Sequence, residues 1–83
     1  MRRDWISSLE ISEITGKSHK KIRKKIKRTI ARLDDQQVDW SCVQKPVLYG
    51  KEYSLGLAFT HELVKGYAKL EQYRILGWFR KDV

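Results

Sequence analysis

The chain has 83 residues, 41% of them hydrophobic, and a net charge of +8, which predicts one folded domain over residues 1–83 and leaves too little chain for two cores. No apolar run approaches the ~20 residues that span a bilayer, and no signal-peptide stretch follows the charged N-terminus. The single cysteine, Cys42, excludes an internal disulfide and a multi-cysteine metal site. We therefore expect a soluble cytoplasmic protein, without contact to a membrane, in which Cys42 is a small buried hydrophobe.

The positive charge is concentrated in residues 17–32. This segment holds nine of the 18 Lys and Arg residues and no Asp or Glu, whereas the rest of the chain has nine cations against ten acids. A nearly neutral body with one cationic segment is the distribution expected of a polyanion binder. A charge run is often only a solvated face, but here no acid is present to form the i,i+4 ion pairs that stabilise such helices. We therefore interpret the segment as a nucleic-acid-binding element.

Two helices are expected in the N-terminal half. The first begins near Ser7, where Ser7-Ser8-Leu9-Glu10 has the spacing of a capping box, and it ends at Thr15-Gly16, because glycine accepts the left-handed conformation that often follows a helix. Ser18 is the candidate N-cap of the second helix. The two helices are thus separated by a turn of about three residues, which is helix-turn-helix spacing.

The second helix is expected over residues 19–33. Ile22, Ile26, Ile30 and Leu33 recur at spacings of four, four and three, so they form one apolar stripe on an α-helix. Packing of this stripe into the core turns the opposite side of the helix outward. At about 100° per residue, the outward side carries Lys20, Lys21, Lys24, Lys27 and Arg28, with Ala31 as a small residue among them.

A β-hairpin is expected after the polar connector that follows the second helix. Val47-Leu48-Tyr49 and Glu52-Tyr53-Ser54-Leu55 are short β-type runs separated by Gly50-Lys51, and Pro46 marks the entry to the first strand. A hairpin behind a helix-turn-helix is the usual composition of a wing, and Lys51 at its tip is then a candidate phosphate contact. The alternative is that the hairpin only covers the core, with its two tyrosines as packing residues.

The C-terminal third is expected to be helical. Thr60 is a candidate N-cap for a third helix with Leu63 and Val64, and Gly66-Tyr67 interrupts that helix. Residues 67–80 are long enough for a further helix of about four turns, whose aromatic side chains either pack across the domain or form a homodimer interface. The expected architecture is therefore α+β and mainly helical: a helix-turn-helix with a β-hairpin wing (winged-helix-like) and a long C-terminal helix.

Catalytic and cofactor motifs are absent from the sequence. His19 and His61 are the only histidines, neither has spaced metal ligands around it, and no glycine-rich phosphate loop occurs. Ser7, Ser8 and Cys42 carry nucleophilic atoms, but no pattern supplies any of them with a base and an orienting group. We therefore expect no enzyme activity, no metal and no cofactor.

Two blocks of the sequence resemble the Rha family of phage and prophage regulatory proteins. Thr15-Gly16-Lys17-Ser18-His19, after a short helix, is similar to the family's Thr-Gly-Lys turn and following histidine. Glu52-Tyr53 and Leu63-Val64-Lys65-Gly66-Tyr67 are similar to its Glu-Tyr strand and Leu-Val-x-Gly-Tyr helix, with Arg74 and Trp78 near the expected downstream places. The resemblance implies a winged-helix-like regulator of phage gene expression in a bacterial host cell, sometimes placed upstream of an antirepressor-type domain.

The chain departs from the family pattern in three respects. Its second helix is more basic, its connector over residues 34–46 does not follow the family pattern, and no second domain is expected after Val83. The expected lack of a second domain argues against a multidomain antirepressor, and the additional basic residues favour direct DNA contact.

The predicted function is sequence-specific binding of double-stranded DNA by a transcriptional regulator whose second helix enters the major groove. The alternative is an antirepressor that docks on a repressor or host protein; RNA binding is less favoured, because the aromatic residues have core periodicity. His19 lies near the apolar stripe, so packing at the helix end competes with DNA contact there, whereas Lys20 and Lys21 project outward. The expected DNA-binding residues are Lys17, Ser18, His19, Lys20, Lys21, Lys24, Lys27, Arg28 and Lys51.

Overall fold

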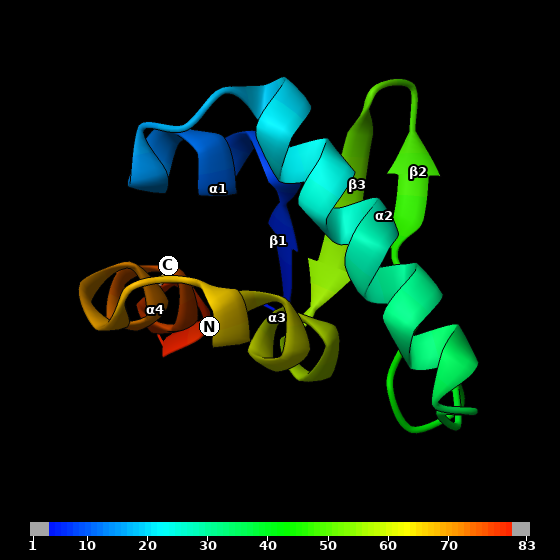
Figure 1. Ribbon diagram of the computed structural model, residues 1–83. Coiled ribbons are helices and arrows are strands. Elements are labelled where there is room, and N and C mark those ends of the chain that lie inside the picture. The colour runs from blue at the N-terminus through cyan, green and yellow to red at the C-terminus, as the bar shows by residue number, and fades with distance from the viewer. Residues whose placement is uncertain (1–3, 81–83) are drawn as a thin grey trace.

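The computed structural model describes residues 4–80 as a small α+β domain with a three-stranded antiparallel sheet (Figure 1). The α+β class predicted from the sequence is confirmed, and the arrangement is compatible with a winged-helix-like fold. The elements in chain order are β1 (Trp5–Ser7), α1 (Ser8–Thr15), α2 (His19–Asp35), β2 (Val47–Tyr49), β3 (Glu52–Gly56), α3 (Leu57–Leu63), the 3₁₀ turn η1 (Val64–Gly66), α4 (Lys69–Gly77) and the 3₁₀ turn η2 (Trp78–Arg80).

The central strand of the sheet is β3, which pairs with β1 on one side and with β2 on the other. Its side chains alternate: Tyr53 and Leu55 are buried in the core, while Ser54 lies on the opposite face. The predicted hairpin is confirmed, because Val47 pairs with Ser54 and Tyr49 with Glu52 across the turn. Strand β1 has only three residues and was not predicted from the sequence.

Both predicted helix starts in the N-terminal half are confirmed by their caps. The Ser7 hydroxyl accepts the Glu10 N–H at 3.1 Å, and the Ser18 hydroxyl accepts the Lys21 N–H at 3.3 Å. Gly16 ends α1 with a φ of +71°, and its N–H donates to the Ser12 carbonyl at 2.9 Å. This left-handed residue reverses the chain between α1 and α2.

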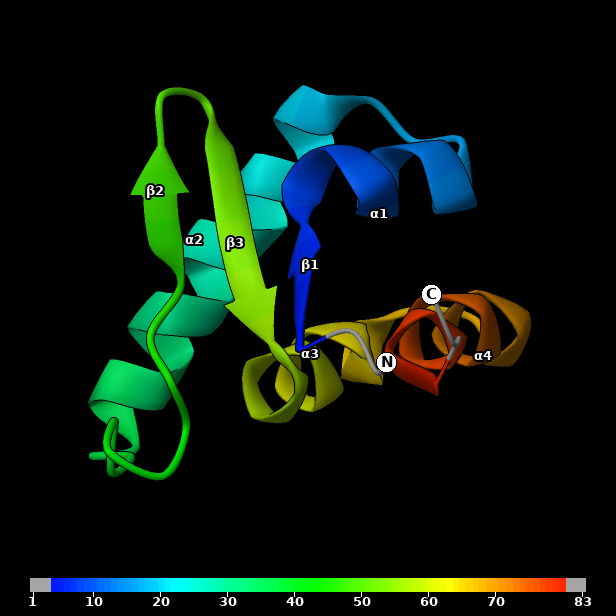
Figure 2. The ribbon, with the colours of Figure 1, turned by 180° about the vertical axis from the view of Figure 1, so that it is seen from behind.

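Helix α2 crosses one face of the sheet and fixes its own orientation through its apolar stripe (Figures 1 and 2). Ile22, Ile26 and Leu33 are at most 2% exposed and belong to the same core as Leu55 and Phe59, and Ile30 packs against it. Full burial of one such side chain contributes about 1.5–3 kcal/mol. The stripe therefore determines which residues of α2 point to the solvent.

The start of the third helix differs from the prediction. Helix α3 begins at Leu57, directly after β3, with Gly56 as its N-cap. Thr60 lies inside the helix, where its buried hydroxyl donates to the Gly56 carbonyl at 2.7 Å. The prediction of Thr60 as an N-cap was therefore wrong, because its hydroxyl bonds back to the preceding turn instead of to a free N–H.

The long C-terminal helix is also shorter than predicted. Tyr67 is extended, with φ −101° and ψ 159°, so α4 starts only at Lys69 and gives way to η2 after Gly77. Ile75 and Phe79 are buried, so this segment packs across the domain, whereas Leu70 and Tyr73 stay exposed. Cys42, predicted as a buried hydrophobe, is exposed in the connector between α2 and β2.

Candidate nucleic-acid interface

The nine cations of residues 17–32 fall into two groups. Arg23, Lys25 and Arg32 are half-buried, because they flank the apolar stripe of α2 and lean on the rest of the domain. The other six are exposed, and all but Lys17 lie on the side of α2 that was predicted to face outward; they are Lys17, Lys20, Lys21, Lys24, Lys27 and Arg28.

Acids from the C-terminal helices pair with the two ends of this segment. The Arg32 guanidinium lies 3.6 Å from the Glu62 carboxylate and donates to the Glu62 carbonyl at 3.1 Å. The Lys17 ammonium lies 3.4 Å from the Glu71 carboxylate. Within residues 4–80, no acid lies at ion-pair distance from the five exposed cations between them. We call these five the basic face: Lys20, Lys21, Lys24, Lys27 and Arg28.

His19 does not belong to the basic face. It is half-buried, and its Nε2 lies 2.7 Å from the hydroxyl of Ser8, a side chain with no exposed surface. The same hydroxyl accepts the Tyr53 N–H at 2.9 Å, so it joins α1, α2 and β3. The sequence left open whether His19 packs at the helix end or contacts DNA, and in this structure it packs at the helix end.

The contact between Ser8 and His19 was missed by sequence reasoning, because no spacing rule links residues eleven positions apart on two helices. A hydroxyl beside an imidazole is also the start of a nucleophilic pair. Ser8 is fully buried, however, and its hydroxyl is engaged by the Tyr53 amide. We therefore interpret the pair as a structural link.

The remaining predicted contacts lie at the surface. Ser18 is exposed, with its hydroxyl oxygen engaged in capping α2. Lys51 is exposed in the turn between β2 and β3. Figures 1 and 2 agree that this turn lies at the same end of the molecule as the start of α2. The structure thus places Lys51 at the end of the domain where the basic face begins.

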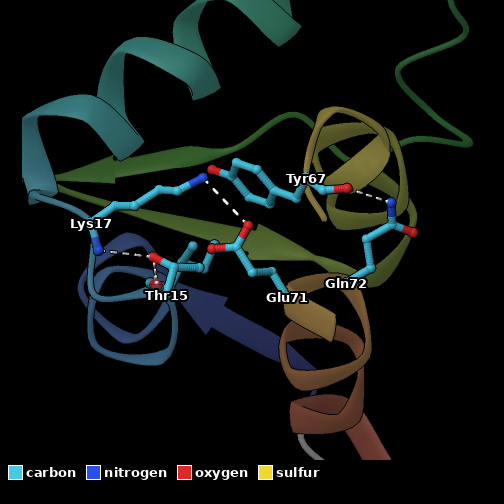
Figure 3. A network of polar contacts seen from close by, with 6 residues as sticks. Thr15, Lys17, Tyr67, Glu71 and Gln72 are labelled. Atoms are coloured by element: carbon cyan, nitrogen blue, oxygen red, sulfur yellow. Dashed lines mark hydrogen bonds and ion pairs between the residues drawn. The ribbon is translucent and has the colours of Figure 1, made fainter. Parts of the chain in front are cut away.

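A pocket of about 430 Å³ lies between the first half of α2 and Tyr67. The Lys17 and Lys25 ammonium groups lie 4.4 Å and 4.2 Å from the centre of the Tyr67 ring. Figure 3 shows the Lys17 side chain extending toward Tyr67 and forming an ion pair with Glu71. Burial, and then repulsion by Lys17, lower the pKa of Lys25. The pocket is lined by Lys17, Lys21, Ile22, Lys24, Lys25, Arg28 and Tyr67.

Comparisons of the sequence with protein-family models and curated proteins, and of the structure with solved structures, found no match. Within residues 4–80, no helix is long and apolar enough to cross a membrane, and no group of three or more His, Cys, Asp or Glu side chains could hold a metal ion. The basic face and the adjoining pocket therefore form the candidate functional site.

Proposed function

We propose that the protein binds duplex DNA through the basic face of α2 and acts as a transcriptional regulator of the phage or prophage type. The observation that carries this proposal is the row of five exposed cations that have no acid partner within residues 4–80, on a helix whose other side is anchored in the core. From Lys20 to Arg28 the helix rises about 12 Å. The major groove of B-DNA is about 12 Å wide and admits one α-helix.

In this proposal the two ends of the basic face have different tasks. Lys20 and Lys21 lie in the first turn of α2, the part of a recognition helix that comes nearest to the base edges. Lys24, Lys27 and Arg28 follow and contact phosphates. The hairpin serves as a wing. With α1, the Gly16 turn and α2 forming the helix-turn-helix, this is the winged-helix arrangement expected of a regulator similar to the Rha family.

A second candidate function is docking on another protein, as an antirepressor does. The observation that favours it is the apolar edge strand β2, in which Leu48 is 54% and Tyr49 68% exposed. An exposed edge strand is a template for pairing with another chain. The two candidate functions differ in the partner that the protein binds, which is duplex DNA in the first and another protein in the second.

The test is fluorescence anisotropy with a labelled random duplex over a series of salt concentrations. Each phosphate contact adds about 0.9 to the slope of log affinity against log salt. The double variant Lys24→Ala/Lys27→Ala should therefore bind all duplexes more weakly, with a slope smaller by about two. The control Lys69→Ala/Arg74→Ala removes the same charge from exposed positions of α4 and should keep the slope. Equal slopes for the parent and the Lys24/Lys27 variant would contradict the proposal.

A further inference from the structure

The pocket beside Tyr67 is surrounded by positive charge. Ile22 and Tyr67 provide its apolar lining, and the other five lining residues are cations from residues 17–28. Among residues 4–80, no acid lines the pocket; Glu71 pairs with Lys17 but is not a lining residue. Cations gathered around a hollow with apolar walls concentrate the field there and attract an anion.

Tyr67 lines this pocket and carries a buried hydroxyl group. The side chain is 7% exposed, and its hydroxyl has no hydrogen-bond partner among residues 4–80. A buried tyrosine hydroxyl usually has a partner, because an unsatisfied one destabilises the fold. Burial, with a smaller contribution from Glu71, raises the pKa of Tyr67 to about 12. The hydroxyl therefore keeps its proton at neutral pH.

Two ammonium groups lie over the same tyrosine ring. Lys25 is additionally held beside Gly66, in space that a Cβ atom at position 66 would occupy. Lys17 has Glu71 as a partner, whereas Lys25 has no acid at ion-pair distance within residues 4–80. The mutual repulsion of Lys17 and Lys25 is relieved when an anion binds between them. A ligand with several anionic oxygens can accept from both ammonium groups and from the hydroxyl.

We propose that this pocket binds a phosphate group, with Tyr67, Lys17 and Lys25 as its hydrogen-bond donors. The two lysine side chains cover the ring in the free protein, and their flexible stems allow them to turn toward the phosphate. Lys21, Lys24 and Arg28 form the rim, which joins the pocket to the basic face. That the phosphate is part of a DNA backbone, and not a free anion, rests on the proposed function.

The phosphate site itself is tested without DNA. Inorganic phosphate is titrated into ¹⁵N-labelled protein, against sodium chloride at equal ionic strength, and the amide shifts of Lys17, Lys25 and Tyr67 are followed. We expect a saturable response to phosphate alone, with affinity reduced about tenfold in Tyr67→Phe, because one hydrogen bond to an anion is lost. The variant should melt no lower than the parent without phosphate, since it loses only an unpartnered hydroxyl. An absent response, or equal affinity in Tyr67→Phe, overturns the proposal.

The source of the phosphate is tested with a labelled 20-base-pair duplex. Tyr67→Phe should bind it about tenfold more weakly at an unchanged salt slope, whereas the control Tyr73→Phe, at an exposed position of α4, should bind like the parent. If Tyr67→Phe binds phosphate more weakly but binds the duplex like the parent, the pocket is a site for free phosphate and does not contact the DNA backbone. If the parent protein binds no duplex, the proposed function fails and the phosphate titration alone decides the pocket. If an acidic peptide shifts the same amide signals and phosphate does not, the assignment of the pocket to phosphate is overturned.

Discussion

Replacement of Ser8 by alanine should destabilise the domain strongly for so small a change. The Ser8 hydroxyl is buried, accepts the Tyr53 N–H at 2.9 Å and lies 2.7 Å from His19 Nε2. Alanine removes both hydrogen bonds and leaves the Tyr53 amide without an acceptor inside the core. A buried donor left unsatisfied costs about 1–3 kcal/mol, so the free energy of unfolding should fall by about 2 kcal/mol.

The assay is thermal and urea unfolding followed by circular dichroism. In a domain of this size, a loss of about 2 kcal/mol lowers Tm by about 8–16 °C. Ser7→Ala is the matched control, since its hydroxyl only caps α1 and its loss costs about 1 kcal/mol. His19→Ala should cost less than Ser8→Ala, because the Tyr53 amide then keeps its acceptor. A Tm for Ser8→Ala equal to that of the parent, or above that of Ser7→Ala, would refute the role of this hydroxyl in joining α1, α2 and β3.

Three further predictions concern the turn, the pH dependence and the contact face. Gly16→Val should cost about 1 kcal/mol or more, because a β-branched residue is strained at the observed φ of +71°; an unchanged Tm would contradict this. The pKa of Tyr67 is raised from 10.0 to about 12, so the folded state disfavours the ionised side chain. The neutral side chain therefore contributes stability that is fully present below pH 10 and is lost as the pH rises to about 12. In urea unfolding at a series of pH values, Tyr67→Phe should lose less stability than the parent over this range. Lys20→Ala should weaken discrimination between a selected DNA site and random duplex without changing Tm, whereas His19→Ala should mainly lower Tm. If His19→Ala abolished DNA binding in a folded protein and Lys20→Ala had no effect, the contact face would lie elsewhere on the helix.

The elements that the sequence predicted well are those governed by local rules. The caps at Ser7 and Ser18, the left-handed Gly16 and the hairpin turn at Gly50 depend on a few neighbouring residues. The orientation of α2 also follows from spacing alone, since the isoleucine stripe repeats at the helical period. For this reason the basic face could be predicted residue by residue.

The errors come from contacts between distant parts of the chain. Strand β1 forms because it pairs with the edge of β3. A segment of three residues is too short to show this pairing in its sequence pattern. Helix α4 starts late because the Tyr67 ring is fixed in the core with its backbone extended. The position of His19 is set by Ser8 on another helix, and the pocket requires Tyr67 to lie under Lys25, 42 positions earlier in the chain. Tertiary packing decides such features, so periodicity and capping do not report them.

If the basic face binds DNA as we propose, the free and the DNA-bound protein should respond to ionic strength in opposite ways. In the free protein these like charges repel along α2, and at about 0.1 M salt the Debye length is about 10 Å, short enough to weaken that repulsion across the helix. Added salt should therefore stabilise the free fold. In the proposed complex the same ions would compete with the cations for the phosphates and release the protein. The proposal thus predicts that a moderate ionic strength keeps the protein both folded and bound to DNA.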